Sequence, residues 1–415
     1  MKPALPSPRL DYLDAVRAFA LLLGIVFHAG LSFLPMYIGW AVMDVSTSAW
    51  VAGFTLVSHS FRMELFFLIA GFFSRMTFHG KGLKAFLSTR LARIGIPFVV
   101  GWFLLRPLIV SGWIMGAESM RGEVDIPGGL RGGFASLSTL PQDLLVGTHL
   151  WFLYYLLLIT AITLLGRALL GSVPVFGRTL TQLADALTAW ISTSRLGLIA
   201  LAGPTAGALW MMSGWGMDTP DKSLMPNLPV LAVYSGCFVF GWLLHRQQAL
   251  LVSFARLTTP RWVLCGASMA ACLVLAGFQN DPGHPNLSLY RALFVVSYAL
   301  MMWSLVALCI GLFKRFFDTP NRVIRYLADA SYWLYLAHLP IVVWLQIAVA
   351  ELPVHWSLKL FTVSALTIAI CTVLYDLFVR STFVGKVLNG RRKLPLWRAS
   401  SGRLYSGGQP GEVHE

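Results

Sequence analysis

Two ionisable residues lie eleven positions apart in the first apolar run of the chain. Arg17 is followed by ten residues without a charge and then by His28. Eleven residues make about three turns of an α-helix, so both side chains are expected on one helix face, roughly 16 Å apart along the axis. An imidazole titrates near neutral pH and can act as a general base. The alternative to a catalytic role is a structural one, in which His28 hydrogen-bonds a neighbouring helix and Arg17 is a positively charged anchor.

A second group of ionisable residues lies in the next apolar run, which reads His59-Ser60-Phe61-Arg62-Met63-Glu64. A lone guanidinium near the middle of a membrane is costly, so Arg62 is expected to face a partner or a polar cavity. His59 and Arg62 are three residues apart and share a helix face, whereas Glu64 is rotated away from Arg62. These groups are candidates for binding substrate or stabilising an oxyanion; an interhelical ion pair is the alternative.

Two further histidines lie in apolar surroundings later in the chain. His149 is expected at the external end of one helix, and His338 midway along another. Each is a candidate for the border of an external cavity, and each could equally be a structural hydrogen-bonding group.

A basic segment, Arg75 to Pro97, follows the second apolar run. Within it, Arg90 and Arg93 are three residues apart and could present a fork of N–H groups to phosphate oxygens. On charge alone, a topology signal that also attracts anionic lipid is the simpler explanation.

These side chains must be positioned by long apolar helices. The chain has 415 residues, of which 57% are hydrophobic and 12% charged, whereas soluble domains carry about 25% charged residues. The composition therefore predicts an all-α, polytopic membrane helix bundle. We predict ten transmembrane helices, near residues 15–35, 50–74, 94–114, 146–166, 196–212, 229–245, 262–278, 290–312, 327–350 and 358–379.

The basic residues predict the orientation of this bundle. If the N-terminus is cytoplasmic, 25 of the 32 Lys and Arg residues fall in cytoplasmic segments and six in external ones, with Arg62 inside a helix. This alternation is typical of the positive-inside rule and predicts that both termini are cytoplasmic. It also explains the net charge of +14 without a nucleic-acid partner, because no single exposed face collects the charge.

The sequence also predicts the domain boundary, the external segment and the state of the first apolar run and of the cysteines. Residues 1–385 are predicted to form one transmembrane domain and residues 386–415 a basic, disordered cytoplasmic tail. The external segment 115–145 contains Gly128, Gly129, Gly132 and Gly133 and is expected to be flexible. The first apolar run has no cleavage-like ending and is expected to remain as a helix. The five cysteines lie in apolar runs without ligand-like spacing, which favours neither a disulfide frame nor a metal site.

The order of these motifs resembles the acyltransferase 3 family of membrane acyltransferases, and within it the glucan biosynthesis protein C branch, which succinylates osmoregulated periplasmic glucans in Gram-negative bacteria. The resemblance covers Asp11 to about Arg380. It depends on the following motifs: Arg17-x10-His28, the run from Phe61 to Phe72, the run from Arg90 to Pro97, His149-Leu-Trp-Phe-Leu, and the run from Ala330 to Pro340.

The resemblance implies a role for several of these residues. His28 would be the essential base, Arg17 would belong to the same motif, and Arg90 and Arg93 would match the basic motif of the family. Many members carry a soluble extracytoplasmic domain that is not in this sequence. The acceptor is therefore expected to be recognised by the bundle and its external loops.

The resulting hypothesis is a membrane O-acyltransferase in the bacterial inner membrane. Arg90 and Arg93 would bind cytoplasmic acyl-CoA, with succinyl-CoA as the expected donor and no bound cofactor. His28 would deprotonate a glucan hydroxyl, and Arg62 would stabilise the oxyanion. No Ser or Cys lies beside a base by spacing, which favours direct transfer over a covalent intermediate. Alternatives are O-acetylation of another envelope polysaccharide, a proton-coupled secondary transporter, and a non-catalytic subunit of a polysaccharide export complex.

Overall fold

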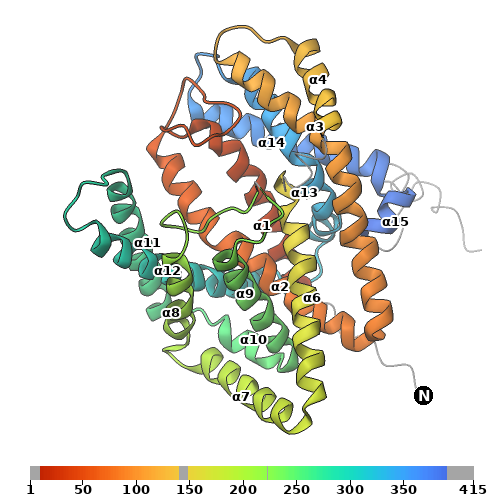
Figure 1. Cartoon of the computed structure of the whole chain (residues 1–415), viewed down its shortest axis with the longest axis vertical. Helices are drawn as coiled ribbons and strands as arrows, with labels where there is room; N and C mark the ends of the chain where they lie inside the picture. Colours follow the sequence, from red (N-terminus) through yellow and green to blue (C-terminus); the bar gives the residue numbers. More distant parts are fainter. Residues whose placement is uncertain (1–9, 140–147, 222, 390–415) are drawn as a thin grey trace, which may run out of the picture.

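The computed structural model describes residues 10–139, 148–221 and 223–389, and every regular element within them is a helix (Figure 1). The predicted all-α fold is therefore confirmed. The helices that follow the predicted apolar runs are α1 (Asp11–Gly30), α2 (Ala49–Arg90), α3 (Ile96–Ser119), α6 (Trp151–Ser172), α8 (Gly197–Trp210), α9 (Leu228–Arg246), α11 (Thr259–Ala276), α12 (Leu287–Phe316), α13 (Arg322–Val349) and α14 (Trp356–Leu374). The other α-helices are α4 (Ile126–Ala135), α7 (Pro174–Thr193), α10 (Ala249–Phe254) and α15 (Phe383–Asn389).

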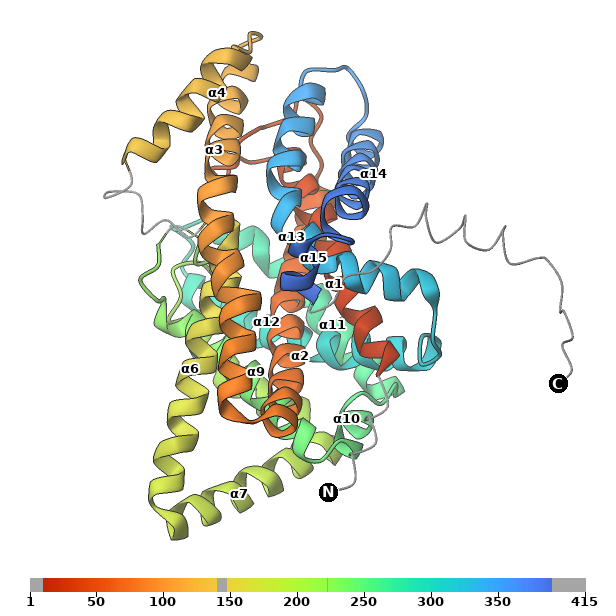
Figure 2. The ribbon, with the colours of Figure 1, turned by 90° about the vertical axis from the view of Figure 1, so that its right-hand side faces the viewer.

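Eight helical stretches of the described chain are long and apolar enough to cross a membrane, or nine if the bent pair α7–α8 is one broken span. One of the eight, Ala49–Ser119, has 71 residues. If straight it would be roughly 107 Å long, against a hydrocarbon core of about 30 Å. It instead turns back at Gly82, where the backbone is not helical, so that Arg90 lies beside Ser74. From there the chain continues through the π-helical segment Leu91–Gly95 into α3, which runs opposite to the first part of α2 (Figure 2). A multi-pass membrane protein is thus supported, while the count of ten crossings and the cytoplasmic termini stay predictions.

Helix α1 lies inside the bundle and is surrounded by α2, α12, α13 and α14. Its apolar side chains Val16, Ala20 and Ile25 are fully buried among these neighbours. Because α1 is enclosed on several sides, it holds a polar residue at its C-terminal end, His28, inside the protein rather than against lipid.

Helices α2 and α9 pack backbone to backbone at two glycines. A Cβ atom at Gly71 of α2 would overlap the carbonyl oxygen of Phe238, and one at Gly241 of α9 would overlap that of Leu68. Small residues permit such close approach between membrane helices, where dispersion contacts rather than hydrophobic burial hold helices together. This contact fixes the helix that carries His59, Arg62 and Glu64.

The prediction of a flexible external loop over 115–145 is wrong for the part of it that the structure describes. Helix α3 extends to Ser119, and α4 packs back along it, while residues 140–145 lie outside the described chain. A Cβ atom at Gly129 would overlap the side chain of Met115, and one at Gly133 would overlap the carbonyl oxygen of Pro107. The glycines of this segment therefore form a packing surface and not a hinge.

Two other segments differ from the sequence-based expectation. Helix α2, predicted to end near residue 74, continues to Arg90 past a break at Gly82, where φ is 77° and glycine avoids the steric cost of a side chain. The predicted disordered tail begins inside α15, which is helical to Asn389, and the rest of it, from residue 390, lies outside the described residues.

Candidate active site

One cavity of about 2520 Å³ extends through the bundle and collects most of the candidate residues. One end is lined by Arg17, Thr89, Arg90 and Arg93, and the other by loop residues that include Trp40. This volume exceeds the roughly 300–1,000 Å³ of a typical small-ligand site, so there is room for two substrates that meet.

His28 is hydrogen-bonded to His338 in the middle of this cavity. Their nitrogens Nδ1 of His28 and Nε2 of His338 are 2.9 Å apart. Nδ1 of His338 lies 3.0 Å and 2.8 Å from the carbonyl oxygens of Leu334 and Tyr335, which can only accept. That nitrogen must therefore carry the proton, and when both rings are neutral its Nε2 accepts from the Nδ1–H of His28. The free lone pair of His28 is then on Nε2, as a general base requires.

His149 packs against this pair. Its ring centroid is 5.8 Å from that of His338, and its Nε2 donates to the carbonyl oxygen of Leu336 over 3.1 Å. Nδ1 of His149 is buried and has no hydrogen-bond partner. The preceding residue, Thr148, has φ 49°, a strained conformation for a β-branched residue that costs about 1–3 kcal/mol. Such strain is typical of segments that place a functional side chain.

Arg62 lines the same cavity one helix away. Its guanidinium carbon lies 4.5 Å from the ring centre of Phe27, and its Nη1 is buried without a hydrogen-bond partner. His59 also lines the cavity, and its Nε2 is 3.0 Å from the hydroxyl of Thr219. Glu64 is different: it is fully buried, both carboxylate oxygens lack a side-chain or backbone partner, and it is not among the cavity-lining residues. The structure thus groups His59 and Arg62 with His28 and leaves Glu64 outside.

The basic end of the cavity is lined by arginines from separate parts of the chain. Arg90 donates from Nη2 to the hydroxyl of Ser74 and lies over the ring of Phe86, with its guanidinium carbon 5.0 Å from the ring centre. The carbonyl oxygen of Arg93 accepts from the hydroxyl of Tyr332 on α13 over 2.6 Å. Arg17 is 3.3 Å from Asp14 and remains partly exposed. Three guanidinium groups therefore face one end of the cavity.

Sequence reasoning missed the residues that hold His28 from the opposite end. Trp40 stacks on His28, with ring planes 2° apart and centroids 5.8 Å apart. Its Nε1 donates to Oε1 of Gln346 over 2.9 Å, and Nε2 of Gln346 donates to the carbonyl oxygens of His28 and Ala29. A lone glutamine in an apolar helix was the available signal for Gln346. Trp40 carried no comparable signal.

The far mouth of the cavity is shaped by the segment from Ser213 to Thr219. The carboxylate of Asp218 accepts from the backbone N–H and hydroxyl of Ser213 and from the N–H of Gly214, over 2.9–3.1 Å. These bonds hold the turn that brings Thr219 to His59. A tryptophan-lined mouth and a basic end thus lie on either side of a central imidazole with a free lone pair. This arrangement suits two ligands that enter from opposite ends, one of which loses a proton to the imidazole.

Comparison with known proteins identifies the family of the chain. A family model described as an acyltransferase domain matches residues 10–376. Proteins named glucans biosynthesis protein C from Salmonella agona (strain SL483) and Salmonella enteritidis PT4 (strain P125109) are each 26% identical over 395 residues, which is 94% of this chain and 96% of theirs. No solved structure matches the chain. The chain therefore belongs to the acyltransferase 3 family and is a membrane acyltransferase.

Proposed function

We propose that this protein transfers a succinyl group, or a related acyl group, from cytoplasmic acyl-CoA to hydroxyls of periplasmic glucans. The observation that carries the proposal is the single cavity that has Arg90 and Arg93 at one end, His28 in the middle and Trp40 at the other end. A donor and an acceptor that enter from opposite ends would meet at His28. The relatives named glucans biosynthesis protein C support a glucan as acceptor.

In the donor half, the three arginines supply fixed positive charge for the phosphates of coenzyme A. Guanidinium groups bind phosphate oxygens through paired, charge-assisted hydrogen bonds. The positive-inside distribution of Lys and Arg supports a cytoplasmic location for this end.

In the transfer step, Nε2 of His28 takes the proton of the acceptor hydroxyl as its oxygen attacks the thioester carbonyl. The new C–O bond forms, the C–S bond breaks, and the proton passes to the leaving thiolate to give coenzyme A. His338 keeps the base in the required tautomer and accepts from Nδ1–H of the imidazolium. Arg62, whose Nη1 has no protein partner, is the candidate donor to the oxyanion.

In the acceptor half, Trp40, Trp50 and Trp113 line the mouth together with Gln279 and Asn280. Flat aromatic faces beside amide groups suit a polyhydroxylated chain, whose sugar rings have apolar faces and hydroxyl edges.

The test replaces the proposed base. Cells that lack the chain are complemented with wild type, His28→Ala or, as a matched control, His284→Ala, which lies outside the cavity. Succinyl esters on periplasmic glucans are measured by mass spectrometry, with protein levels checked in membranes. His28→Ala is expected to lose activity by about 10²–10⁴-fold, as for loss of a general base, and His284→Ala to retain it.

Two other outcomes would contradict parts of the proposal. Normal succinylation with His28→Ala at wild-type levels would rule out His28 as the base. Unaltered glucans in cells without the chain would rule out the acceptor, and other envelope polymers would then be searched for lost esters. Release of coenzyme A by purified protein, compared between succinyl-CoA and acetyl-CoA and without a transmembrane gradient, separates the enzyme from a transporter and identifies the donor.

A further inference from the structure

A second group of basic side chains lies at the α7 end of the molecule and does not line the cavity. It consists of Arg75 on α2, Arg167 on α6 and Arg246 on α9, with His245 beside them. We call these four residues the α7 basic cluster. It is separate from Arg90 and Arg93, so the acyl transfer proposed above makes no use of it.

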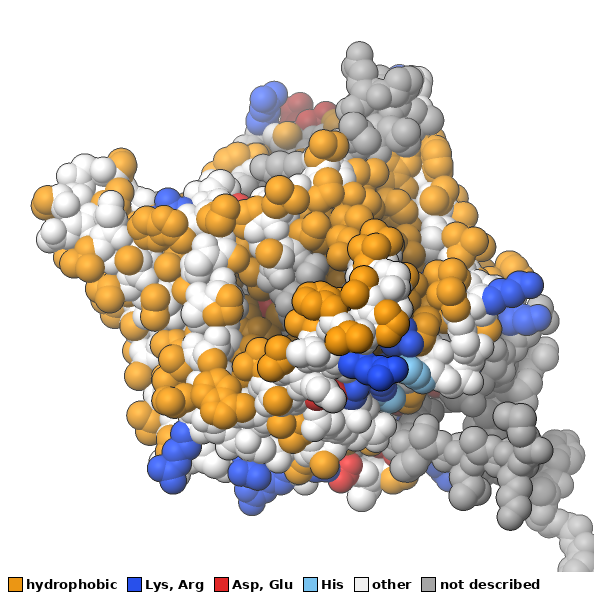
Figure 3. Space-filling model, turned by 60° about the horizontal axis from the view of Figure 1, so that its bottom comes forward, with side chains coloured by type: hydrophobic (Ala, Val, Ile, Leu, Met, Phe, Trp, Pro, Cys, Tyr) orange, Lys and Arg blue, Asp and Glu red, His pale blue; other side chains and the backbone are white. Residues whose placement is uncertain are grey.

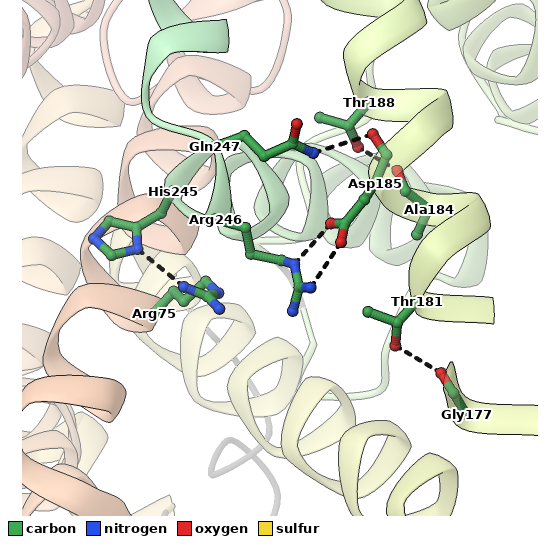
Figure 4. A network of polar contacts seen from close by, with 9 residues as sticks. All are labelled: Arg75, Gly177, Thr181, Ala184, Asp185, Thr188, His245, Arg246 and Gln247. Atoms are coloured by element: carbon green, nitrogen blue, oxygen red, sulfur yellow. Dashed lines mark hydrogen bonds and ion pairs between the residues drawn. The ribbon is translucent and has the colours of Figure 1, made fainter. Parts of the chain in front are cut away.

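The cluster is held by a network between three helices (Figure 4). Arg75 donates from Nη1 to Nδ1 of His245 over 3.3 Å. Arg246 forms a bidentate pair with Asp185 of α7, with both N–O distances at 2.7 Å, and Gln247 donates to the backbone carbonyl of Asp185. Only Arg246 of the three arginines is therefore neutralised by a carboxylate in the described chain.

The other two arginines keep unused donors. Nε of Arg75 is buried without a partner, and the guanidinium of Arg167 stacks on Phe78 with its carbon 5.0 Å from the ring centre. Arg167 and Arg246 both lie within electrostatic range of Arg75 and repel its charge. Among the described residues of the cluster, the three guanidinium groups thus share one carboxylate, that of Asp185. An added anion would reduce the repulsion between these guanidinium groups.

Helix α7 places this cluster at a defined depth. It meets α8 at an angle of 113° and crosses the end of the bundle instead of running along it (Figure 2). Apart from Val175, its large exposed apolar side chains recur at spacings of three and four and form one stripe, consisting of Phe176, Leu180, Leu183, Leu187 and Trp190. A helix with such a stripe lies in the membrane interface with its apolar face toward the acyl chains.

The surroundings of the cluster match this position. Figure 3, which brings this end of the molecule forward, shows Lys and Arg side chains among many apolar side chains. Phosphates of lipid headgroups lie at the depth of an interfacial helix, directly above the acyl chains that its apolar stripe contacts. A free inorganic anion would gain no binding energy from apolar side chains near the site.

We propose that the α7 basic cluster binds the phosphate of an anionic phospholipid. The guanidinium groups of Arg75 and Arg167 donate to the phosphate oxygens. Arg246 is held back by Asp185 and fixes α7 against α9. The site binds a lipid whether or not the chain transfers acyl groups to glucans.

The experiment uses the purified full-length protein after delipidation in detergent. Binding of phosphatidylglycerol, phosphatidylcholine and inorganic phosphate is measured by native mass spectrometry. Each basic residue near an anionic surface contributes about fivefold in affinity, so the double variant Arg75→Gln/Arg167→Gln is expected to bind phosphatidylglycerol about 25-fold more weakly. The matched control, Lys81→Gln/Lys84→Gln, removes the same charge from exposed positions on α2 and should bind as wild type does.

Each outcome decides the proposal. Wild-type protein should prefer phosphatidylglycerol to phosphatidylcholine, and excess inorganic phosphate should not displace the lipid. Unchanged binding by the double variant, or an equal loss in the lysine control, overturns the specific site. Displacement by inorganic phosphate would show a free-anion site instead. If the glutamine variant fails to fold, Arg75→Lys/Arg167→Lys keeps the charge but loses the paired donors and is expected to bind at an intermediate level.

Discussion

At the scale of single residues, the proposed base, His28, is defined by its hydrogen bonds more than by its position in α1. His338 has both carbonyl contacts on one side and His28 on the other, and this sequence of donors and acceptors leaves the lone pair of His28 on Nε2. Trp40 and Gln346 hold the same imidazole from its face and its backbone. The chemistry attributed to His28 therefore requires three positioning residues from other parts of the chain.

His338→Leu tests this arrangement because it removes the acceptor of the Nδ1–H of His28. We expect kcat for acyl transfer to fall by roughly tenfold or more. The fall should not exceed the contribution of the general base itself, about 10²–10⁴-fold. KM for the donor should stay unchanged, since His338 lies away from the basic end of the cavity. Steady-state kinetics with purified protein measure both constants.

His338→Gln is the control for this variant. Its side-chain carbonyl can still accept a hydrogen bond, so it should restore part of the lost kcat. If the leucine and glutamine variants are equally impaired, or if KM alone changes, His338 has a role in packing and not in tautomer selection.

The sequence singled out most of the histidines and arginines that line this cavity, but not their pairing and not Trp40 or Gln346. Helical periodicity relates residues a few turns apart, which is why Arg17 and His28 were expected on one face. His28 and His338 are 310 residues apart, and no local rule brings them together. Glu64 shows the converse: it follows Arg62 closely in sequence, but lies on a face that the cavity does not reach.

At the scale of elements, one contact between two helices and one ion pair between a helix and a loop set the shape of the site. The α2–α9 contact at Gly71 and Gly241 fixes the helix that bears Arg62. On the opposite side, Lys359 of α14 and Asp44 form a buried ion pair with an N–O distance of 2.7 Å, which fastens the segment that carries Trp40. Asp44 lies outside the helices, and burial raises the pKa of its carboxyl group, while its hydrogen bond to Lys359 opposes that shift.

Gly71→Ala tests the contact between α2 and α9. The added methyl group would overlap the backbone of Phe238, so the helices must move apart at a cost of about 1–3 kcal/mol or more. A lower thermal unfolding midpoint in detergent is the expected result. Gly236→Ala on the same α9 is the control, because its Cβ meets nothing within 4 Å and alanine favours a helix. Equal midpoints for both variants would contradict the close contact.

The sequence predicted most elements from hydropathy alone, because lipid forces each crossing segment to be a long apolar helix. It did not predict α4 or α7. Glycine-rich segments commonly indicate turns. Three of the four glycines of α4, Gly129, Gly132 and Gly133, are explained only by their close contact with α3. Helix α7 lies between two predicted crossing helices, where its basic residues indicate a cytoplasmic segment, and only the spacing of its apolar residues indicates a helix.

At the scale of the whole molecule, the cavity joins regions that hydropathy treats as opposite sides of a membrane. Its basic end is formed by α1 and the end of α2, and its aromatic end by loops that include Trp40. The orientation of these two ends determines which substrate can reach which arginine or tryptophan.

Thr89→Cys and Gln279→Cys test this orientation, because both residues line the cavity at opposite ends. In intact spheroplasts, a membrane-impermeant thiol reagent is expected to label Gln279→Cys, and to label Thr89→Cys only after permeabilisation. Wild type is the control, since its five cysteines are buried and should react little. The reverse pattern would overturn the cytoplasmic assignment of the basic end and of both termini.

The extent of the cavity also bears on the energy supply of the cell. A water-accessible path through a membrane protein is a route by which protons and metal ions could discharge the membrane potential. Fixed positive charge along such a path raises the barrier to cations. Arg62 in its middle and Arg90 at its end give the path this selectivity, so the residues suited to hold an anionic donor also favour retention of the ion gradients.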